Sequence, residues 1–248
     1  MNLILCESSD VDAQGVVTLI GVRAAHVRGV LRADVGDTIR IGVVDGPRGR
    51  AEILALHDDR VVLRAELDAT TPDVPQVDLL LALPRPKVLR RLWAQLAALG
   101  VGRIVLTNAA RVERHYFDTH VVEASTYRPL LIEGLQQAGD TRLPRVSVHR
   151  QFRILVADEL DALSGGAARL VAHPGGHPSL LEVARESPDQ RVLLAIGPEG
   201  GWNEFELDLL TGHGFRIVSM GPRILRTDTA CIALLTLLHE ARRQPAPR

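Results

Sequence analysis

The most informative part of the sequence is Leu194-Ala-Ile-Gly-Pro-Glu-Gly-Gly-Trp-Asn-Glu-Phe-Glu206. It opens inside a continuous apolar run, residues 191–196, and a glycine-rich loop follows at once from Gly197. Asn203 and Glu206 stand three residues apart, the spacing of a capping box at a helix start, with Asn in the place of Ser or Thr. A buried strand, a glycine loop and a helix in this order predict one unit of a parallel sheet, in which such loops bind ligands.

The glycines of this loop permit a second interpretation. Besides a ligand site, they suit a tight turn whose backbone needs positive φ angles. The loop is neither a Walker phosphate loop nor a dinucleotide fingerprint, because the Lys-Ser/Thr pair and the GxGxxG spacing are both missing.

A second stretch of the same kind is Met220-Gly-Pro-Arg-Ile-Leu-Arg-Thr-Asp-Thr-Ala230. It follows the apolar residues 215–219 and opens a helix, for which Thr227 is the predicted N-cap. Taken alone, this stretch is explained equally well as a helix cap with surface arginines. Two glycine-bearing loops at the ends of successive strands favour a ligand site over two unrelated turns.

Strand and helix patterns alternate around these two loops. The apolar runs are residues 77–83, 103–107, 168–172, 191–196 and 215–219, and the helical patterns lie near 88–99, 121–138, 204–213 and 228–243. Continuous apolar strands separated by amphipathic helices predict an α/β domain, a parallel sheet covered on both faces, over residues 73–248.

The chain before this domain has a different pattern. Residues 37–44, 49–56 and 60–66 form short β-rich segments punctuated by Gly, Pro and Asp, after a short helical segment at 23–30. Such spacing predicts a small β-barrel over residues 1–72. Residues 69–75, polar and with two prolines, predict the linker between the two domains.

Composition limits the function classes. The 248 residues are 46% hydrophobic and 24% charged with a net charge of −1, which excludes a disordered chain and a protein that coats nucleic acid by bulk charge. Residues 73–150 nevertheless hold 11 basic and 7 acidic side chains, so a local basic face is allowed.

Metal and membrane functions find no support in the sequence. Cys6 and Cys231 make neither a metal-binding spacing nor a disulfide framework, and the nine histidines include no HExxH pairing. We expect no metal, no membrane partner and a cytoplasmic location, because signal-peptide and membrane-spanning patterns are missing.

The two glycine-bearing motifs, GPEGGW at 197–202 and MGPRILRTDTA at 220–230, resemble those of the 16S ribosomal RNA uracil-N3 methyltransferases of the SPOUT superfamily. The resemblance covers nearly the whole chain. His26-Val-Arg-Gly-Val-Leu-Arg32 ahead of Val35-Gly-Asp37 is similar to the family's N-terminal PUA-like barrel, and His173-Pro174 follows in the family's order.

This resemblance implies a SPOUT-type sheet with a C-terminal trefoil knot, a homodimer, and 16S ribosomal RNA of the small subunit as the partner. It also implies S-adenosylmethionine as the cofactor, with no metal. The residues that it assigns to the cofactor pocket are His173, Pro174, Ile196, Gly197, Glu199, Gly200, Gly201, Met220, Gly221, Ile224, Leu225, Arg226, Thr229 and Ala230.

The same resemblance suggests catalytic roles for Arg226 and Asp228. Uracil N3 must lose its proton before it accepts a methyl group, and our hypothesis is that Asp228 is the base or orients it. Arg226 then stabilises the charge that develops on the uracil oxygens. Glu199 is the alternative candidate for the catalytic carboxylate. A structural role, in which its negative charge faces the positive end of a helix dipole, explains this residue equally well.

Basic side chains suggest where RNA binds. The candidates are Arg23, Arg28 and Arg32 in the first domain and Arg85, Lys87, Arg90 and Arg111 in the second. Clusters of this kind also occur as ordinary solvated faces.

The middle of the chain departs from the family pattern. Ala98 and Asp140 replace a usual Glu and Arg, Gln136 replaces a carboxylate, and Asp228 stands where Glu is usual. Two alternatives therefore stay open: methylation of another RNA base or ribose, and a non-catalytic RNA-binding paralogue or assembly factor.

Overall fold

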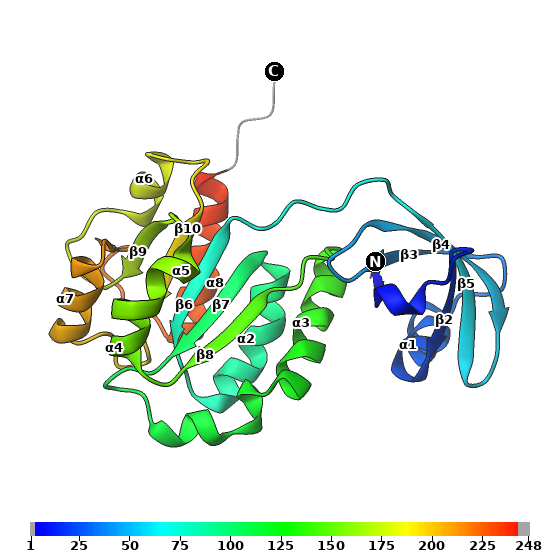
Figure 1. Ribbon diagram of the computed structural model, residues 1–248, viewed down its shortest axis with the longest axis horizontal. Helices are drawn as coiled ribbons and strands as arrows, with labels where there is room; N and C mark the ends of the chain where they lie inside the picture. The colour runs from blue at the N-terminus through cyan, green and yellow to red at the C-terminus, as the bar shows by residue number, and fades with distance from the viewer. Residues whose placement is uncertain (1–2, 243–248) are drawn as a thin grey trace. The chain divides into compact units, whose positions relative to one another are not determined.

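The computed structural model describes residues 3–242, and the chain divides into two compact units whose elements are labelled in Figure 1. The first unit is Met1–Val74 together with Ile132–Leu143, and the second is Pro75–Leu131 together with Pro144–Arg248. The sequence pattern predicted one boundary, between residues 72 and 73, and no return of the chain to the first unit.

The first unit is built on a curled, mixed five-stranded sheet. Its strands are β1 (Ile4–Cys6), β2 (Val16–Ile20), β3 (Thr38–Val43), β4 (Arg48–Leu56) and β5 (Arg60–Leu67), in the order β1-β3-β4-β5-β2. β1 pairs with β3 in parallel and the other neighbours are antiparallel. The predicted small β-barrel is observed as a curled half-barrel, in which β1 and β2 remain the two edges.

Alternating burial along these strands forms the core of the half-barrel. Ile39, Ile41, Ile53 and Leu63 point to one face, as the period of two in a strand requires. The helix α1 (Gly21–His26) and the π-helical turn η2 (Val27–Leu31) add Ala24 and Val27 to the same core. The helical segment predicted at 23–30 is thereby confirmed.

The segment Ile132–Leu143 packs closely against the sheet of the first unit. A Cβ at Gly42 would lie 2.6 Å from the Thr141 side chain, so glycine is required at this point of β3. The Thr141 hydroxyl donates to the Gly46 carbonyl at 2.6 Å, and Arg48 donates to the Gly139 carbonyl at 3.2 Å. These bonds join residues more than 90 positions apart, which no local pattern predicts.

The second unit contains a six-stranded sheet in which every pair of neighbours is parallel. The order is β11-β9-β10-β6-β7-β8, and β6 and β10 are buried throughout. The strands are β6 (Val77–Ala82), β7 (Val101–Thr107), β8 (Arg145–His149), β9 (Ala168–Ala172), β10 (Val192–Ile196) and β11 (Arg216–Val218). The predicted parallel sheet is confirmed, and the edge strand β8 was missed because its residues alternate between polar and apolar types.

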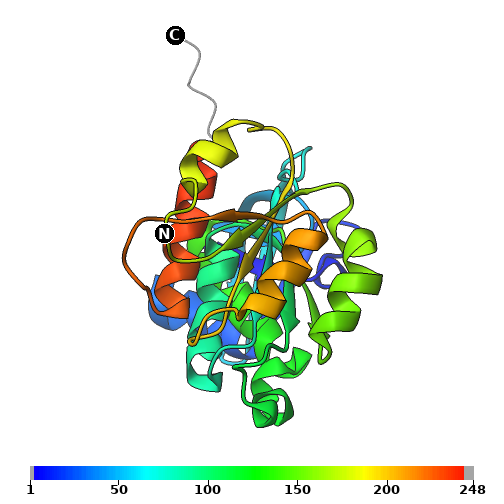
Figure 2. The same cartoon turned by 90° about the vertical axis from the view of Figure 1, so that its left-hand side faces the viewer.

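Helices cover both faces of this sheet. They are α2 (Pro86–Ala98), α4 (Phe152–Ile154), α5 (Leu160–Ser164), α6 (Leu180–Arg185), α7 (Glu204–Gly212) and α8 (Thr227–Ala241). A further helix, α3 (Ala124–Ala138), begins in the second unit and belongs to the first from Ile132 onward. Figure 2 shows α8, in red, and α2 on one side of the sheet, and α7, in orange, on the other. The predicted end of the last helix, Arg243, lies outside the described residues.

The parallel arrangement determines where a site can form. Because all six strands run the same way, the loops that follow β6, β7, β9, β10 and β11 gather at one edge of the sheet. The trefoil knot implied by the family resemblance stays a prediction. Within residues 3–242, no helix is long and apolar enough to cross a membrane.

Candidate functional site

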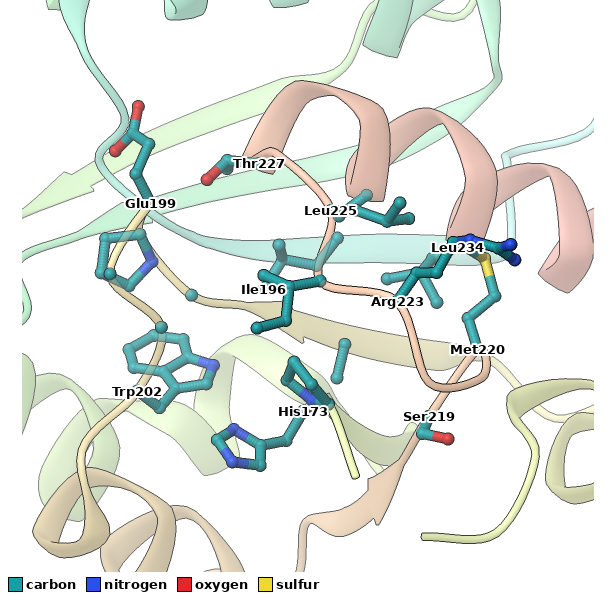
Figure 3. A pocket seen from close by; sticks show the side chains of 18 of the residues that line it. His173, Ile196, Glu199, Trp202, Ser219, Met220, Arg223, Leu225, Thr227 and Leu234 are labelled. Carbon is teal, nitrogen blue, oxygen red and sulfur yellow. The ribbon is translucent and has the colours of Figure 1, made fainter. Parts of the chain in front are cut away.

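A cavity of about 440 Å³ lies at the carboxyl edge of the parallel sheet (Figure 3). This volume is within the range of pockets that bind small molecules. The lining comes from the loops after β9, β10 and β11, from Arg111 after β7, and from the first turns of α8. Residues from strands and a helix that are far apart in the sequence therefore line one cavity.

The cavity brings together most of the residues that the family resemblance assigned to the cofactor. These are His173, Pro174, Ile196, Gly197, Glu199, Gly200, Gly201, Met220, Gly221, Ile224, Leu225 and Ala230. Arg226 and Thr229 are not among the residues that line it. The lining also includes residues that were not singled out, among them Trp202, Ser219, Arg223, Thr227 and Leu234. Trp202 is the last residue of the GPEGGW motif, and this position could have identified it as a lining residue.

The loop after β10 is held by the predicted capping box, which is confirmed. Asn203 accepts a hydrogen bond from the Glu206 backbone at 2.8 Å, and the Glu206 carboxylate accepts one from the Asn203 backbone at 2.9 Å. The second oxygen of Glu206 accepts a hydrogen bond from the Ala110 backbone at 2.6 Å, and the residue is only 3% exposed. One buried carboxylate therefore ties the loop after β7 to the loop after β10.

Close packing explains two glycines of this loop. A Cβ at Gly200 would lie 2.8 Å from the Arg111 side chain, and a Cβ at Gly197 would lie 3.1 Å from the Trp202 backbone. Arg111 also donates a hydrogen bond to the Gly200 carbonyl. Arg111, expected on an RNA-binding surface, is thus part of the wall of the cavity.

The loop after β11 requires glycine for its backbone. Gly221 has a φ of +112°, with open space where a side chain would begin. Its N–H points to the Ser219 hydroxyl at 3.4 Å, and that hydroxyl points to the His177 carbonyl at the same distance. The His173 N–H donates to the Val218 carbonyl at 3.0 Å, so the loops after β9 and β11 hold each other in place.

Two polar atoms of the lining lack partners. Trp202 Nε1 and His173 Nδ1 are buried without a hydrogen bond to any described residue. Burial, and then the neighbouring His177, lower the pKa of His173, so its imidazole is neutral at neutral pH. Figure 3 shows both rings beside Ile196, and Trp202 stacks on Phe152 with ring centroids 5.3 Å apart.

These features fit an adenosine-type ligand that carries a positive charge. Apolar walls from Ile196, Leu225 and Leu234 suit a purine ring, and the unpartnered Trp202 and His173 atoms offer polar groups to it. A neutral imidazole does not repel a cation, and the Glu199 carboxylate attracts one.

The start of α8 differs from the prediction in one respect. Its N-cap is Arg226, whose backbone is extended, and Thr227 is the first helical residue, so the predicted Thr227 N-cap is wrong. Thr227 is buried and lines the cavity, one position too far into the helix to cap it. The neighbouring Asp228 accepts the Thr229 backbone N–H at 3.0 Å instead.

Glu199 lies at a helix start, as the second of its two interpretations proposed. Its carboxylate accepts the Arg85 backbone N–H at 3.2 Å, immediately before α2. The helix that it faces is α2 and not the adjacent α7, because the loops after β6 and β10 meet at the same sheet edge.

The other basic residues predicted for RNA divide into two groups. Arg23 forms an ion pair with Asp10 at 2.5 Å, and Arg28 donates to the carbonyls of His57 and Asp58. The remaining side chains, Arg32, Arg85, Lys87 and Arg90, are exposed.

Metal-binding groups are not assembled in the part of the chain that the structure describes. No cluster of three or more His, Cys, Asp or Glu residues there could hold an ion. Both cysteines are buried, and burial raises the pKa of Cys6 to about 11, so its thiol stays protonated.

Comparison with known proteins places the chain in a family. A family model described as an RNA methyltransferase domain matches residues 71–239. The chain is 31% identical, over 97% of its length and 92% of the relative's, to ribosomal RNA small subunit methyltransferase E of Treponema pallidum. It is 26% identical to the protein of that name from Mycobacterium bovis, over 90% and 86% of the two chains.

Solved structures share the fold. The methyltransferase E of Neisseria gonorrhoeae, bound to S-adenosyl methionine, matches with a TM-score of 0.80 at 20% identity over 97% of both chains. A methyltransferase from Legionella pneumophila, also with this cofactor, matches with a TM-score of 0.75 at 24% identity over 96% and 97% of the two chains. With its two glycine-bearing loops around one cavity and its full-length relatives, the chain belongs to the RNA methyltransferase family that contains ribosomal RNA small subunit methyltransferase E.

Proposed function

We propose that this protein transfers a methyl group from S-adenosylmethionine to N3 of a uridine in 16S ribosomal RNA of the small subunit. The observation that carries the proposal is the cavity itself, formed by the two motifs that the family resemblance assigns to the cofactor. The name of the T. pallidum relative, a small-subunit ribosomal RNA methyltransferase, supports the RNA class.

The chain's own residues account for binding of the cofactor. The loops of Gly197–Trp202 and Met220–Leu225 hold the cofactor between apolar walls, and Gly221 allows the backbone to approach it. When bound, S-adenosylmethionine supplies a methyl group on a positively charged sulfur, and the electron pair of the broken carbon–sulfur bond stays on that sulfur.

Arg226 and Asp228 act at the nucleotide. The N3–H proton passes to a solvent water molecule, the resulting negative charge spreads over N3 and the uracil oxygens, and the electron pair left on N3 forms the new N–C bond. Arg226, exposed and one residue from the cavity wall, stabilises that charge. The ion pairs of Asp228 favour the role of orienting residue over that of base.

The proposal includes RNA contacts and a homodimer. Arg85, Lys87 and Arg90, exposed at the start of α2, are free to bind phosphate groups. Ile224, which is 82% exposed, supports a second copy of the chain covering this edge, as do the partly exposed Met220 and Ile232. With ribosomal RNA as the substrate, the protein acts in the cytoplasm.

The test is methylation of small subunits from cells that lack the enzyme, with labelled S-adenosylmethionine. We expect label in 16S ribosomal RNA and a stop in primer extension, because an N3-methyl group blocks the pairing edge of uracil. Label on a ribose or on transfer RNA would favour the first alternative. Absence of cofactor binding by calorimetry would favour a non-catalytic RNA-binding protein.

A further inference from the structure

One ion-pair cluster lies beside the cavity and includes a residue that no motif pointed to. The Asp228 carboxylate is 3.1 Å from Nη2 of Arg91, which is on α2. Its other oxygen accepts the Thr229 backbone N–H at 3.0 Å and lies 3.8 Å from Nε of Arg226. Both helix starts belong to the second unit, so the cluster joins α2 to the first turn of α8.

Burial distinguishes the members of this cluster. The Asp228 side chain is 21% exposed, whereas those of Arg91 and Arg226 are 62% and 75% exposed. Both Asp228 oxygens already have partners, so the carboxylate has little freedom to turn toward a substrate. Each guanidinium has five N–H donors, and most of those donors still face solvent.

Position makes the cluster relevant to the reaction. Thr227 stands between Arg226 and Asp228, is buried, and lines the cavity. A movement of this first turn therefore shifts the cavity wall and the Arg226 guanidinium together. Exposed ion pairs contribute little to the free energy of unfolding. The Arg91–Asp228 pair is therefore better explained as ordering the first turn of α8 than as stabilising the whole fold.

We propose that Arg91 is a positioning residue for methyl transfer: by pairing with Asp228 it holds the first turn of α8, and thereby Arg226, beside the cavity. The proposal rests on the proposed function, and it makes Asp228 the link between two arginines. Arg91 itself is not among the residues that line the cavity.

The first experiment measures local order in the full chain without ligand. Hydrogen–deuterium exchange of peptides that cover residues 226–232 is compared for the wild type, Arg91→Gln and Arg90→Gln. We expect several-fold faster exchange in Arg91→Gln, because the Thr229 and Ala230 amides lose their fixed acceptors. Arg90→Gln removes the same charge from the same helix without breaking the pair, and its exchange is expected to match the wild type.

The second experiment measures kinetics with small subunits as substrate. We expect Arg91→Gln to lower kcat about tenfold, with an unchanged cofactor Kd, and Arg91→Lys to recover part of the loss. If Arg91 acts through Asp228, then Arg91→Gln combined with Asp228→Asn is no slower than Asp228→Asn alone.

The outcomes separate this proposal from the proposed function. Unchanged exchange at 226–232 in Arg91→Gln overturns the positioning role. So does a rise in the KM for subunits that equals that of Arg90→Gln at constant kcat, since Arg91 is then one phosphate contact among several. If the wild-type protein does not label ribosomal RNA, the proposed function is refuted. The exchange comparison still tests whether Arg91 orders residues 226–232.

Discussion

In the first unit, Arg23 and Arg28 are bound to acceptors within the protein, whereas at the start of α2 in the second unit Lys87 and Arg90 have none among the described residues. Arg23 pairs with Asp10, and Arg28 donates to two carbonyls of the turn after β4. The spacing of basic residues made both groups look alike. A guanidinium can fasten a loop as well as it binds a phosphate, and only its neighbours distinguish the two uses.

The largest expected effect contrasts Arg226→Gln with Arg23→Gln. Loss of Arg226 is expected to lower kcat about 100-fold, because a charge-stabilising donor is removed, while the free energy of unfolding stays unchanged. Loss of Arg23 is expected to leave kcat unchanged and to lower the free energy of unfolding by about 1 kcal/mol. Single-turnover kinetics and urea titrations measure the two quantities. An equal loss of kcat in both variants would contradict the different roles assigned to Arg226 and Arg23.

Backbone strain provides the second contrast. Gly221 and Gly36 both have φ angles that side chains rarely adopt, +112° and +90°, and a Cβ at either position would meet no atom within 4 Å. Valine at either position is expected to cost roughly 1–3 kcal/mol of folding free energy. Only Gly221→Val is expected to weaken S-adenosylmethionine binding as well, by about tenfold or more, as measured by calorimetry. A matching loss in Gly36→Val would mean that global destabilisation explains both.

Salt dependence of RNA binding gives a third, smaller contrast. Lys87→Gln and Arg90→Gln are each expected to weaken binding a few-fold and to reduce the slope of log K against log salt concentration by about 1. Arg28→Gln is expected to leave that slope unchanged, because its guanidinium is already bound to carbonyl groups. The measurement is filter binding of a 16S ribosomal RNA fragment at several salt concentrations. A reduced slope in Arg28→Gln would place this residue on the RNA surface.

Acid is expected to affect the two regions one after the other. Burial lowers the pKa of His173 from its ordinary value of 6.5, so a fall in pH through the lowered pKa protonates the imidazole and weakens binding of the positively charged cofactor a few-fold. Calorimetry between pH 5 and pH 8 measures this change, and His173→Gln should remove most of it.

Asp10 responds at lower pH. A hydrogen bond from Arg23 holds the pKa of Asp10 below its ordinary value of 3.8, so the stability that this pair contributes is complete above pH 3.8 and is lost as the pH falls through the folded-state value. Unfolding titrations of the wild type and Asp10→Asn test this order of events. Cofactor binding that stays constant down to pH 4 would contradict it.

Much of the second unit could be predicted from local pattern. Continuous apolar runs identified five of the six strands of its sheet, and the Asn203–Glu206 spacing identified a capping box that exists as expected. The edge strand β8 and the short helices between β8 and β9 were not predicted, because partly exposed elements lack a continuous apolar run. The spacing of short β-rich segments predicted the barrel-like first unit, but spacing does not show which strands remain edges.

The α/β alternation, the two glycine loops and the central basic excess could be predicted without a structure, since each depends on residues close together in the chain. The folded chain was needed to show that Glu199 faces the start of α2, that Arg111 lines the cavity, and that Arg91 contacts Asp228. The hydrogen bonds that these three side chains form join residues between 89 and 137 positions apart. The physical reason is that a parallel sheet brings the carboxyl ends of distant strands to one edge, and no local pattern encodes which side chains meet there.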